Sequence, residues 1–397
     1  MINNCSGNCI TCGKCASAAI LEKFIAGTRA VTPRDGYGIA IDIGTTTVVL
    51  SLLNLTDGQA VARHSFMNPQ RAFGPDVISR IDAANKGSLG ELNGMITGAI
   101  SAGITALLEV KGVSPAKVID ITIACNTVMT YLLLGFPCES LGVVPFKPAH
   151  SLAGPYKSSD LFPSTGVDCI VRITPWIAAY IGGDITAGLI HVLPEGNKRF
   201  MLLDLGTNGE IAMYDNGRLI VTATAAGPAF EQPVAASQGT EQPFKGASEV
   251  IRALADLVRN EIVDESGFMD GEDAILNQKQ VRDLQLAKSA IRSGLEILLE
   301  ICGYSYGDLD AVYLAGGIGQ AMNVQDAIEI GLIPRDLEDK ARPAGNTSLG
   351  GATALLTAPG ETAADIEKLL PTAEEINLAA QPNFNDYFMD YMSFERD

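Results

Sequence analysis

The chain is poor in positive charge, and its uncharged stretches are short. Its 28 Lys and Arg residues face 46 Asp and Glu residues, which gives a formal net charge of −18. Because so acidic a chain cannot neutralise a phosphate backbone, nucleic acid is excluded as the main partner. The uncharged stretch 121–138 contains Pro137 and predicts a strand plus a buried helix with Asn126 as its N-cap, not a membrane span. The polar start, residues 1–15, does not resemble a signal peptide, so we expect a cytoplasmic protein.

Half of the eight cysteines fall within the first fifteen residues, at Cys5, Cys9, Cys12 and Cys15. So short a segment can hardly form two strain-free disulfides, so it predicts a metal site. Four cysteines on one loop suit an iron–sulfur cluster, typically [4Fe–4S], whereas structural zinc usually takes two pairs with a longer spacer. Zinc and a metal-free segment remain the alternatives. The other cysteines stand singly in apolar contexts, which is typical of inert core thiols in a cytosolic protein.

Two similar segments organise the rest of the chain: IDIGTTT at 41–47 and LDLGTNG at 203–209. Each lies between two short apolar runs, which predicts a β-hairpin with a Gly-Thr turn. Such turns can present backbone N–H groups to phosphate oxygens, and an Asp at the strand end can hold Mg²⁺ or orient water. The candidate residues are Asp42, Gly44, Thr45 and Thr46 in the first copy and Asp204, Gly206, Thr207 and Asn208 in the second. The alternative is that both are ordinary hairpin turns.

A third glycine motif, LAGGIG at 314–319, follows the two hairpins and contains Gly316 and Gly317. This order resembles the actin, sugar-kinase and heat-shock-chaperone ATPase superfamily. The resemblance implies an α/β protein of two RNase H-like halves that bind ATP, preceded by the cysteine-cluster segment. The expected domains are 1–35 with the cysteines, 36–193 with an insertion at 137–163, 194–360, and an acidic, aromatic tail at 361–397 docked on the body.

Four further candidate residues depend on this fold. Asp184 is placed to position the attacking water, although an ordinary carboxylate at a helix start would look the same. Glu231 follows an expected edge strand and would lie near the phosphates. Lys288 and Arg292 are spaced to lie on one helix face against an adenine or ribose, but a solvated charged face is the commoner reason for such spacing.

The chain as a whole resembles the ATP-dependent reductive activators of corrinoid proteins over about residues 37–396. The segments that carry the resemblance are DIGTTT at 42–47, NPQ…GPDVISRI from 68, CNTVMTYLLLG from 125, SLGVVPF from 140, GGDITAG from 182, DLGTNGEI from 204, AGPAFE from 226, QLAKSAIRSGLEILL from 285, LAGGIG from 314 and NFNDYFMDYMSF from 383. The resemblance implies transfer of a low-potential electron from an iron–sulfur cluster to the Co(II) corrinoid protein of a methyltransferase system, driven by MgATP. It also implies an electron donor such as ferredoxin or flavodoxin, with a homodimer as one candidate assembly.

Two features depart from the family pattern. Many relatives carry a whole ferredoxin domain where this chain has a short four-cysteine segment, and residues 232–253 are shortened where relatives have glycine-rich sequence. The competing functions are an activator of another low-potential enzyme such as a 2-hydroxyacyl-CoA dehydratase, a non-redox ATP-binding sensor with a zinc-clamped start, and a sugar or acid kinase.

Overall fold

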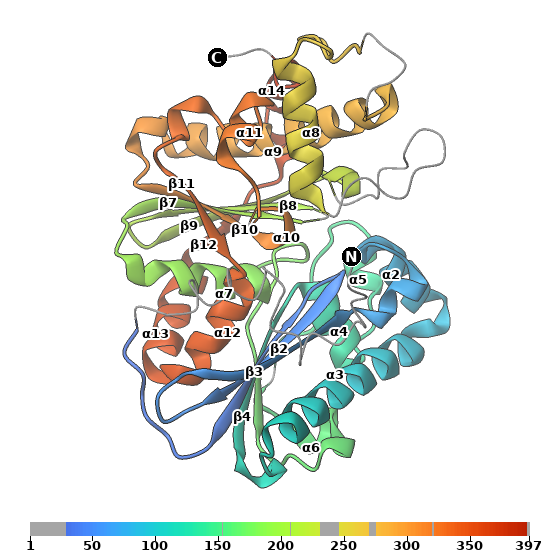
Figure 1. Cartoon of the computed structure of the whole chain (residues 1–397), viewed down its shortest axis with the longest axis vertical. Coiled ribbons are helices and arrows are strands. Elements are labelled where there is room, and N and C mark those ends of the chain that lie inside the picture. The colour runs from blue at the N-terminus through green and yellow to red at the C-terminus, as the bar shows by residue number, and fades with distance from the viewer. Residues whose placement is uncertain are drawn as a thin grey trace, which may run out of the picture. The chain divides into compact units, whose positions relative to one another are not determined.

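The computed structural model describes residues 29–152, 154–206, 208–230, 246–269, 275–319 and 321–394. These residues form two compact units (Figure 1). The first takes in the described residues up to Glu195 together with Thr347–Lys368, and the second takes in Gly196–Asn346 and the described residues from Leu369 onward. The chain therefore crosses between the units three times.

The first unit is built on a six-stranded sheet with the order β3-β2-β1-β4-β6-β5. The first three strands pair antiparallel, and β4 and β6 continue the sheet in parallel with β1. The hairpin predicted around residues 41–47 is confirmed, with Asp42 opposite Val49 in its register. The strands are β1 (Tyr37–Ile43), β2 (Thr47–Asn54), β3 (Ala60–Met67), β4 (Val118–Cys125), β5 (Tyr156–Lys157) and β6 (Ile170–Ile173).

Strand β1 buries both of its faces, each against a different layer of helices. Ile39, Ile41 and Ile43 belong to the core under α3 and α4, whereas Ala40 packs with Ala187 of α7 and other residues of the α12 side. Figure 1 shows α3 on one side of this sheet and α7 and α12 on the other. The helices of the unit are α2 (Val77–Ala83), α3 (Leu89–Lys111), α4 (Thr127–Leu134), α5 (Glu139–Gly142), α6 (Ser158–Leu161), α7 (Gly183–Val192), α12 (Thr347–Thr357) and α13 (Pro359–Leu369), the last of which ends one residue beyond the unit.

The stretch Val77–Lys111 is long and apolar enough to cross a membrane by length and composition. It is interrupted at Gly87, whose φ of 104° is not helical. Its second part, α3, buries Leu92, Ile96 and Ile100 at every fourth position in the first-unit core. This packing is that of a core helix.

The second unit repeats the central strand order of the first, with β9-β8-β7-β10-β11 matching β3-β2-β1-β4-β6. Its sheet runs β11-β10-β7-β8-β9-β12, again with an antiparallel meander, here β7-β8-β9, and a strand, β10, parallel to the first of the three. The second predicted hairpin is thereby confirmed, with Asp204 opposite Glu210. The strands are β7 (Arg199–Leu205), β8 (Gly209–Asp215), β9 (Arg218–Thr224), β10 (Ala311–Ala315), β11 (Ala341–Gly345) and β12 (Ala373–Glu375).

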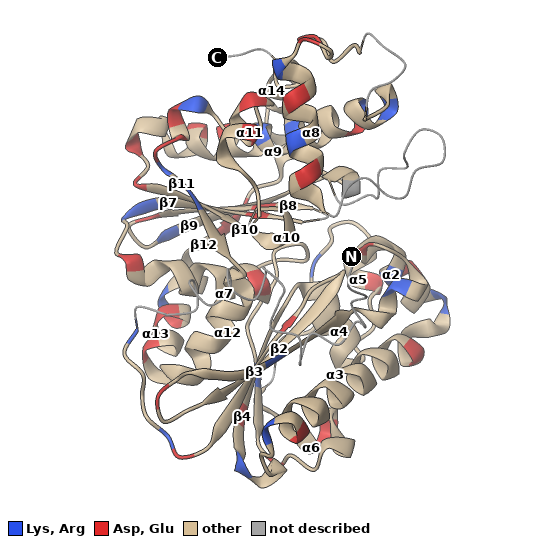
Figure 2. Ribbon diagram, viewed as in Figure 1, with Lys and Arg blue, Asp and Glu red and all other residues tan. Residues whose placement is uncertain are grey.

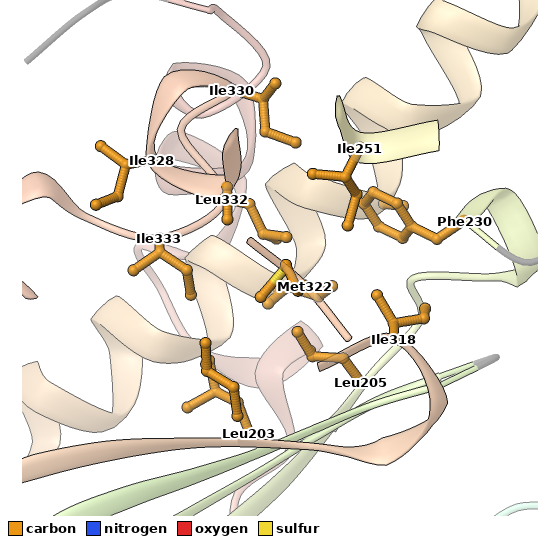
Figure 3. Close-up of a cluster of buried hydrophobic side chains, with 14 of the residues drawn as sticks. Leu203, Leu205, Phe230, Ile251, Ile318, Met322, Ile328, Ile330, Leu332 and Ile333 are labelled. Atoms are coloured by element: carbon orange, nitrogen blue, oxygen red, sulfur yellow. The ribbon is translucent and has the colours of Figure 1, made fainter. Parts of the chain in front are cut away.

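Helices cover one face of this second sheet. Leu203 and Leu205 of β7 point into a core that also contains Ile318, Met322 and Ile251 (Figure 3). The helices are α8 (Ala247–Arg259), α9 (Gln278–Cys302), α10 (Gly316–Gly319), α11 (Val324–Glu329) and α14 (Phe384–Asp390). Helix α9 begins at a capping box in which Asn277 and Gln280 satisfy each other's backbone N–H groups, as the sequence pattern of such caps requires.

One helix belongs to a different unit from the one that we expected. The segment 347–357 fell within the expected second domain, 194–360, but α12 packs in the first unit beside α7. Small residues of both helices allow a close crossing. A Cβ atom on Gly351 would stand 2.0 Å from the carbonyl oxygen of Ala187, and one on Gly350 would stand 2.5 Å from Nδ1 of His191.

This contact predicts the effect of adding one methyl group. We expect Gly351→Ala to lower the free energy of unfolding by about 1–3 kcal/mol, because backbone atoms cannot move aside as a flexible side chain can. The matched control is Gly360→Ala in α13, where an added Cβ meets nothing within 4 Å. Thermal and urea unfolding of the two variants measure the difference, and equal midpoints would contradict the packing described.

Candidate functional site

Hydrogen bonds within the turn between β1 and β2, and from side chains that follow it in the sequence, hold the turn in one conformation. Gly44 N–H donates to the carbonyl oxygen of Thr47 at 3.0 Å, and a Cβ at Gly44 would stand 2.7 Å from that oxygen, so only glycine fits. Asn68 Nδ2 donates to the Gly44 carbonyl at 2.9 Å, and Arg80 Nη2 donates to the Thr45 carbonyl at 2.6 Å. Several carbonyl groups of the turn are thus engaged within the protein, which keeps their negative ends away from a ligand at the turn.

Arg80 places a buried positive charge beneath this turn. Its side chain is fully buried on α2, and burial together with the nearby charge of Arg71 lowers its pKa to about 10, so it stays protonated at neutral pH. In Figure 2 the coloured acidic and basic residues are interspersed over the helices of both units. Arg80 is therefore a local source of positive charge for an anion at the turn. We did not predict it, although an arginine within the apolar run of α2 was a visible signal.

Asp42, the first predicted carboxylate, lies at the end of β1 and accepts a hydrogen bond from a side chain of α12. Ser348 Oγ donates to Asp42 Oδ1 at 2.8 Å. Ser348 is in the first turn of α12, directly after the chain returns to the first unit at Thr347. The partner of Asp42 is 306 residues away in the sequence, which is why sequence reasoning missed it.

Asp184, the second predicted carboxylate of this unit, lies at the start of α7 and within electrostatic reach of Asp42. The two glycines before it pack without room for side chains, since a Cβ on Gly182 would stand 2.3 Å from the Cα of Asn126. Asp184 Oδ1 accepts a hydrogen bond from the Ile185 N–H at 2.9 Å. Burial, with a further contribution from the charge of Asp42, raises the pKa of Asp184 to about 7. Both predicted roles, helix-start carboxylate and site residue, are compatible with this position.

Helix α4 also begins at the turn. Asn126 caps it as predicted, since its Oδ1 accepts from the Met129 N–H at 2.8 Å, and its Nδ2 donates to Thr45 Oγ1 at 3.2 Å. The start of α4 thus contacts the turn, the start of α7 packs on that of α4 at Gly182, and the start of α12 holds Asp42 through Ser348. The positive ends of three helix dipoles thus lie around the Asp42 turn, which favours an anionic ligand.

In the second unit, the glycine motif after β10 lies directly against the second hairpin. Gly206 N–H donates to the Asn208 carbonyl at 2.9 Å. Gly316 has a φ of 78°, and a Cβ there would stand 2.3 Å from Asp204 Oδ1, so the backbone of this motif touches the predicted carboxylate. Gly317 follows in the first turn of α10. Thr207 and Glu231 lie outside the described residues.

Lys288 is engaged by the C-terminal segment. Its Nζ donates to the Ser393 carbonyl at 2.5 Å and lies 5.1 Å from the centre of the Phe394 ring. Arg292 lies 4.6 Å from the centre of the Tyr391 ring. Both side chains are buried, so the expectation of a solvated charged face is wrong. The amino group of Lys288 is in contact with the tail, and its predicted role at a nucleotide remains a prediction.

Comparisons with known proteins agree with this architecture. The family described as the RACo middle region matches residues 37–193, and the one described as the C-terminal domain of RACo, the ASKHA domain, matches 198–253 and 234–397. The chain is 31% identical to the corrinoid activation enzyme RamQ of Eubacterium limosum, in an alignment that covers 89% of this chain and 69% of RamQ. This chain belongs to the family of corrinoid reductive activators.

Two more relatives of the family describe the extent of the match. The [Co(II) methylated amine-specific corrinoid protein] reductase of Methanosarcina barkeri is 25% identical over 57% of this chain, which spans about half of that protein, 52%. The solved structure of a reductive activator for corrinoid,iron-sulfur protein superposes with a TM-score of 0.79 at 28% identity and covers 92% of this chain and 67% of its own. The ATPase-type fold expected from the three glycine motifs is thereby confirmed.

The four cysteines of the predicted cluster, Cys5, Cys9, Cys12 and Cys15, lie outside the described residues. Within the described ranges, no group of three or more His, Cys, Asp or Glu residues could hold a metal ion. The remaining cysteines are free thiols, fully or partly buried, at positions 125, 138, 169 and 302. Burial raises the pKa of the Cys138 and Cys169 thiols to about 11, as expected of unreactive core cysteines.

The raised pKa of Asp184 predicts a pH dependence of stability. The folded protein holds this proton more tightly than the unfolded chain does. The contribution of the protonated carboxyl group to the free energy of unfolding is therefore fully present below about pH 4 and is lost as the pH rises towards 7. Asp184→Asn cannot ionise and should therefore gain stability relative to the natural protein across this interval, by at most about 1.4 kcal/mol per pH unit. Urea unfolding of the nucleotide-free proteins at several pH values measures the difference. A constant difference at all pH values would contradict the assignment, and Asp160→Asn on the exposed side of α6 serves as control.

Proposed function

We propose that this protein reductively activates a corrinoid protein of a methyltransferase system in an ATP-dependent reaction. The observation that carries the proposal is the relationship to RamQ over 89% of the chain, with both hairpins and the third glycine motif inside the matched families. The chain covers between half and about two thirds of the length of its named relatives. The partner is therefore inferred from the corrinoid that all three names contain, and its Co(II) state from the name of the Methanosarcina reductase.

The net reaction has two parts that must be coupled. Co(II) gains one electron and becomes Co(I), the electron coming from a low-potential donor of the ferredoxin or flavodoxin class, while ATP and water give ADP and phosphate. A one-electron transfer that is uphill by about 59 mV has an equilibrium constant lowered tenfold, so a strongly reducing product needs an energy source. Nucleotide can supply it only by binding one conformational state better than another.

The residues of the first unit fit a phosphate ligand with Mg²⁺. A magnesium site at a nucleotide uses one or two carboxylates together with phosphate oxygens, so Asp42 does not need two further protein ligands. The ion when bound would neutralise charge on the phosphate oxygens. The turn of Gly44, Thr45 and Thr46 would bind those oxygens through N–H and hydroxyl donors, above the buried charge of Arg80.

We assign the proton-transfer role to Asp184. A carboxylate with a pKa near 7 is well placed to accept a proton from the attacking water at neutral pH, because its basicity matches the working pH. In the second unit, Asp204 takes the metal- or water-orienting role and Gly206, Thr207 and Asn208 bind phosphate. We further infer that Gly316 and Gly317 line the nucleotide and that Glu231 acts near the phosphates.

The redox centre is inferred from the amino-terminal sequence. Cys5, Cys9, Cys12 and Cys15 would hold an iron–sulfur cluster, which supplies a one-electron donor of low potential when it is bound. Among the described residues there is no other group of three or more His, Cys, Asp or Glu that could hold a metal ion. An iron–sulfur centre, together with the free thiols of the other cysteines, suits the reducing cytoplasm.

The role of Asp42 predicts a loss of both ATP-linked activities. Asp42→Asn should lower the rate of ATP hydrolysis and the ATP-dependent formation of Co(I) by at least about a hundredfold, since the carboxylate that would hold Mg²⁺ at the phosphates is lost. The growth of the Co(I) absorption band under anaerobic conditions and phosphate release are the two measurements. Asp57→Asn, in the exposed turn between β2 and β3, is the control. Equal Co(I) formation by the natural protein with and without ATP would refute the proposed function.

The cysteine assignment has its own test. Anaerobically purified protein should contain about four irons per chain for a [4Fe–4S] cluster and show its absorption and electron-spin-resonance spectra. Cys12→Ser should lose most of the iron, whereas Cys302→Ser on α9 should keep it. A colourless protein that contains one zinc per chain would overturn the redox centre and leave an ATP-binding protein of another function.

A further inference from the structure

The segment that follows the cysteines is fastened to the carboxyl ends of two helices. Arg29 Nη2 donates to the Ile190 carbonyl of α7 at 3.0 Å, and its Nη1 pairs with Asp365 of α13 at 2.7 Å. The Arg29 side chain is only 8% exposed. An arginine at this place satisfies a carbonyl that the helix itself leaves unpaired and complements the negative end of the helix dipole.

Five residues later, a second arginine of the same segment donates a hydrogen bond to a carbonyl in the last turn of α12. Arg34 Nη2 donates to the Leu356 carbonyl at 2.6 Å, and the Thr32 N–H donates to the Thr357 carbonyl at 2.7 Å. The second guanidinium nitrogen of Arg34, Nη1, binds the buried carboxylate of Asp120 at 2.8 Å. Two arginines of one short linker thus bind the last turns of two different helices.

These are the two helices whose first turns belong to the candidate site. Asp184 lies in the first turn of α7, and Ser348, which holds Asp42, lies in the first turn of α12. With ten and eleven residues, the helices are about 15 Å long at 1.5 Å per residue. They touch through backbone at Gly351 and Ala187, so a displacement of one at its first turn is passed on by close-packed contacts.

We propose that the linker 29–34 couples the nucleotide site to the cysteine segment, with Arg29 and Arg34 as the positioning residues. This inference rests on the proposed function. Arg29 stands fourteen positions after Cys15 in the sequence. A change in what Asp42 and Asp184 bind shifts α7 and α12, and the arginines at the other ends of these helices carry the shift to the chain that leads to the four thiolates.

The test separates coupling from catalysis by substituting the anchor. Arg29→Gln removes the ion pair with Asp365 and weakens the bond to Ile190, while the residues of the candidate site are unchanged. We expect ATP hydrolysis within about twofold of the natural protein, and stimulation of Co(I) formation by ATP at least about tenfold smaller. Arg29→Lys, which keeps the charge, should restore part of the stimulation. Lys86→Gln, which removes an exposed ion pair with Asp82 in the same unit, is the matched control.

A second measurement does not need the cluster or a corrinoid partner. In hydrogen–deuterium exchange, MgATP should change the protection of residues 29–36 in the natural protein and in Lys86→Gln, but not in Arg29→Gln. Should Arg29→Gln fail to fold, Asp365→Asn tests the same anchor from its partly exposed side. Full ATP stimulation in the variants, or a parallel loss of hydrolysis and reduction, overturns the coupling. If the natural protein does not reduce cobalt, the proposed function fails, and the exchange experiment still decides whether the linker responds to nucleotide.

Discussion

The contact between α7 and α12 is the constraint on which the first unit depends. Gly351 lets the backbones of the two helices meet at Ala187, and Gly350 makes room for the side chain of His191, so the contact fixes the position of each helix against the other. Because Asp184 and Ser348 stand in those first turns, the contact also fixes the carboxylate of Asp42, which Ser348 holds. A fold that places site residues on helix ends needs such rigid packing, since a small displacement of a reacting group is costly.

The local structure at the site followed from the sequence, because it depends on neighbours along the chain. Apolar runs on both sides of a Gly-Thr turn predicted both hairpins, and Asn126 was a correct helix cap. The residues that complete the site were not predictable, because they come from distant segments. Neither the spacing around Ser348 nor that around Arg80 shows that their side chains reach Asp42 and the carbonyl of Thr45.

The pair of Lys288 and Arg292 shows why periodicity alone misjudged a surface. Charges four residues apart on a helix usually face water, and their backbone spacing is the same when another segment covers them. Here the C-terminal segment covers them: Gln285 Nε2 donates to the Met392 carbonyl at 2.8 Å and Lys288 to that of Ser393. The aromatic residues of the tail provide the ring faces on which both cations lie. The acidic composition of the tail did not show that its backbone carbonyls would accept the hydrogen bonds from Gln285 and Lys288.

The net charge of −18 raises the question of how such a protein attracts ATP, and the site suggests a local answer. Repulsion between exposed charges is screened beyond about 10 Å at moderate salt, so distant carboxylates matter little. What remains near the turn is the buried guanidinium of Arg80 and the first turns of α4, α7 and α12. Two negative charges, Asp42 and Asp184, also lie there. Burial and the charge of Asp42 raise the pKa of Asp184, and the proton that Asp184 then holds removes one of the two negative charges. A divalent cation held by Asp42 would be bound together with phosphate, whereas free phosphate would meet the repulsion of Asp42 and Asp184. We therefore expect the site to prefer the magnesium complex of the nucleotide over the nucleotide alone.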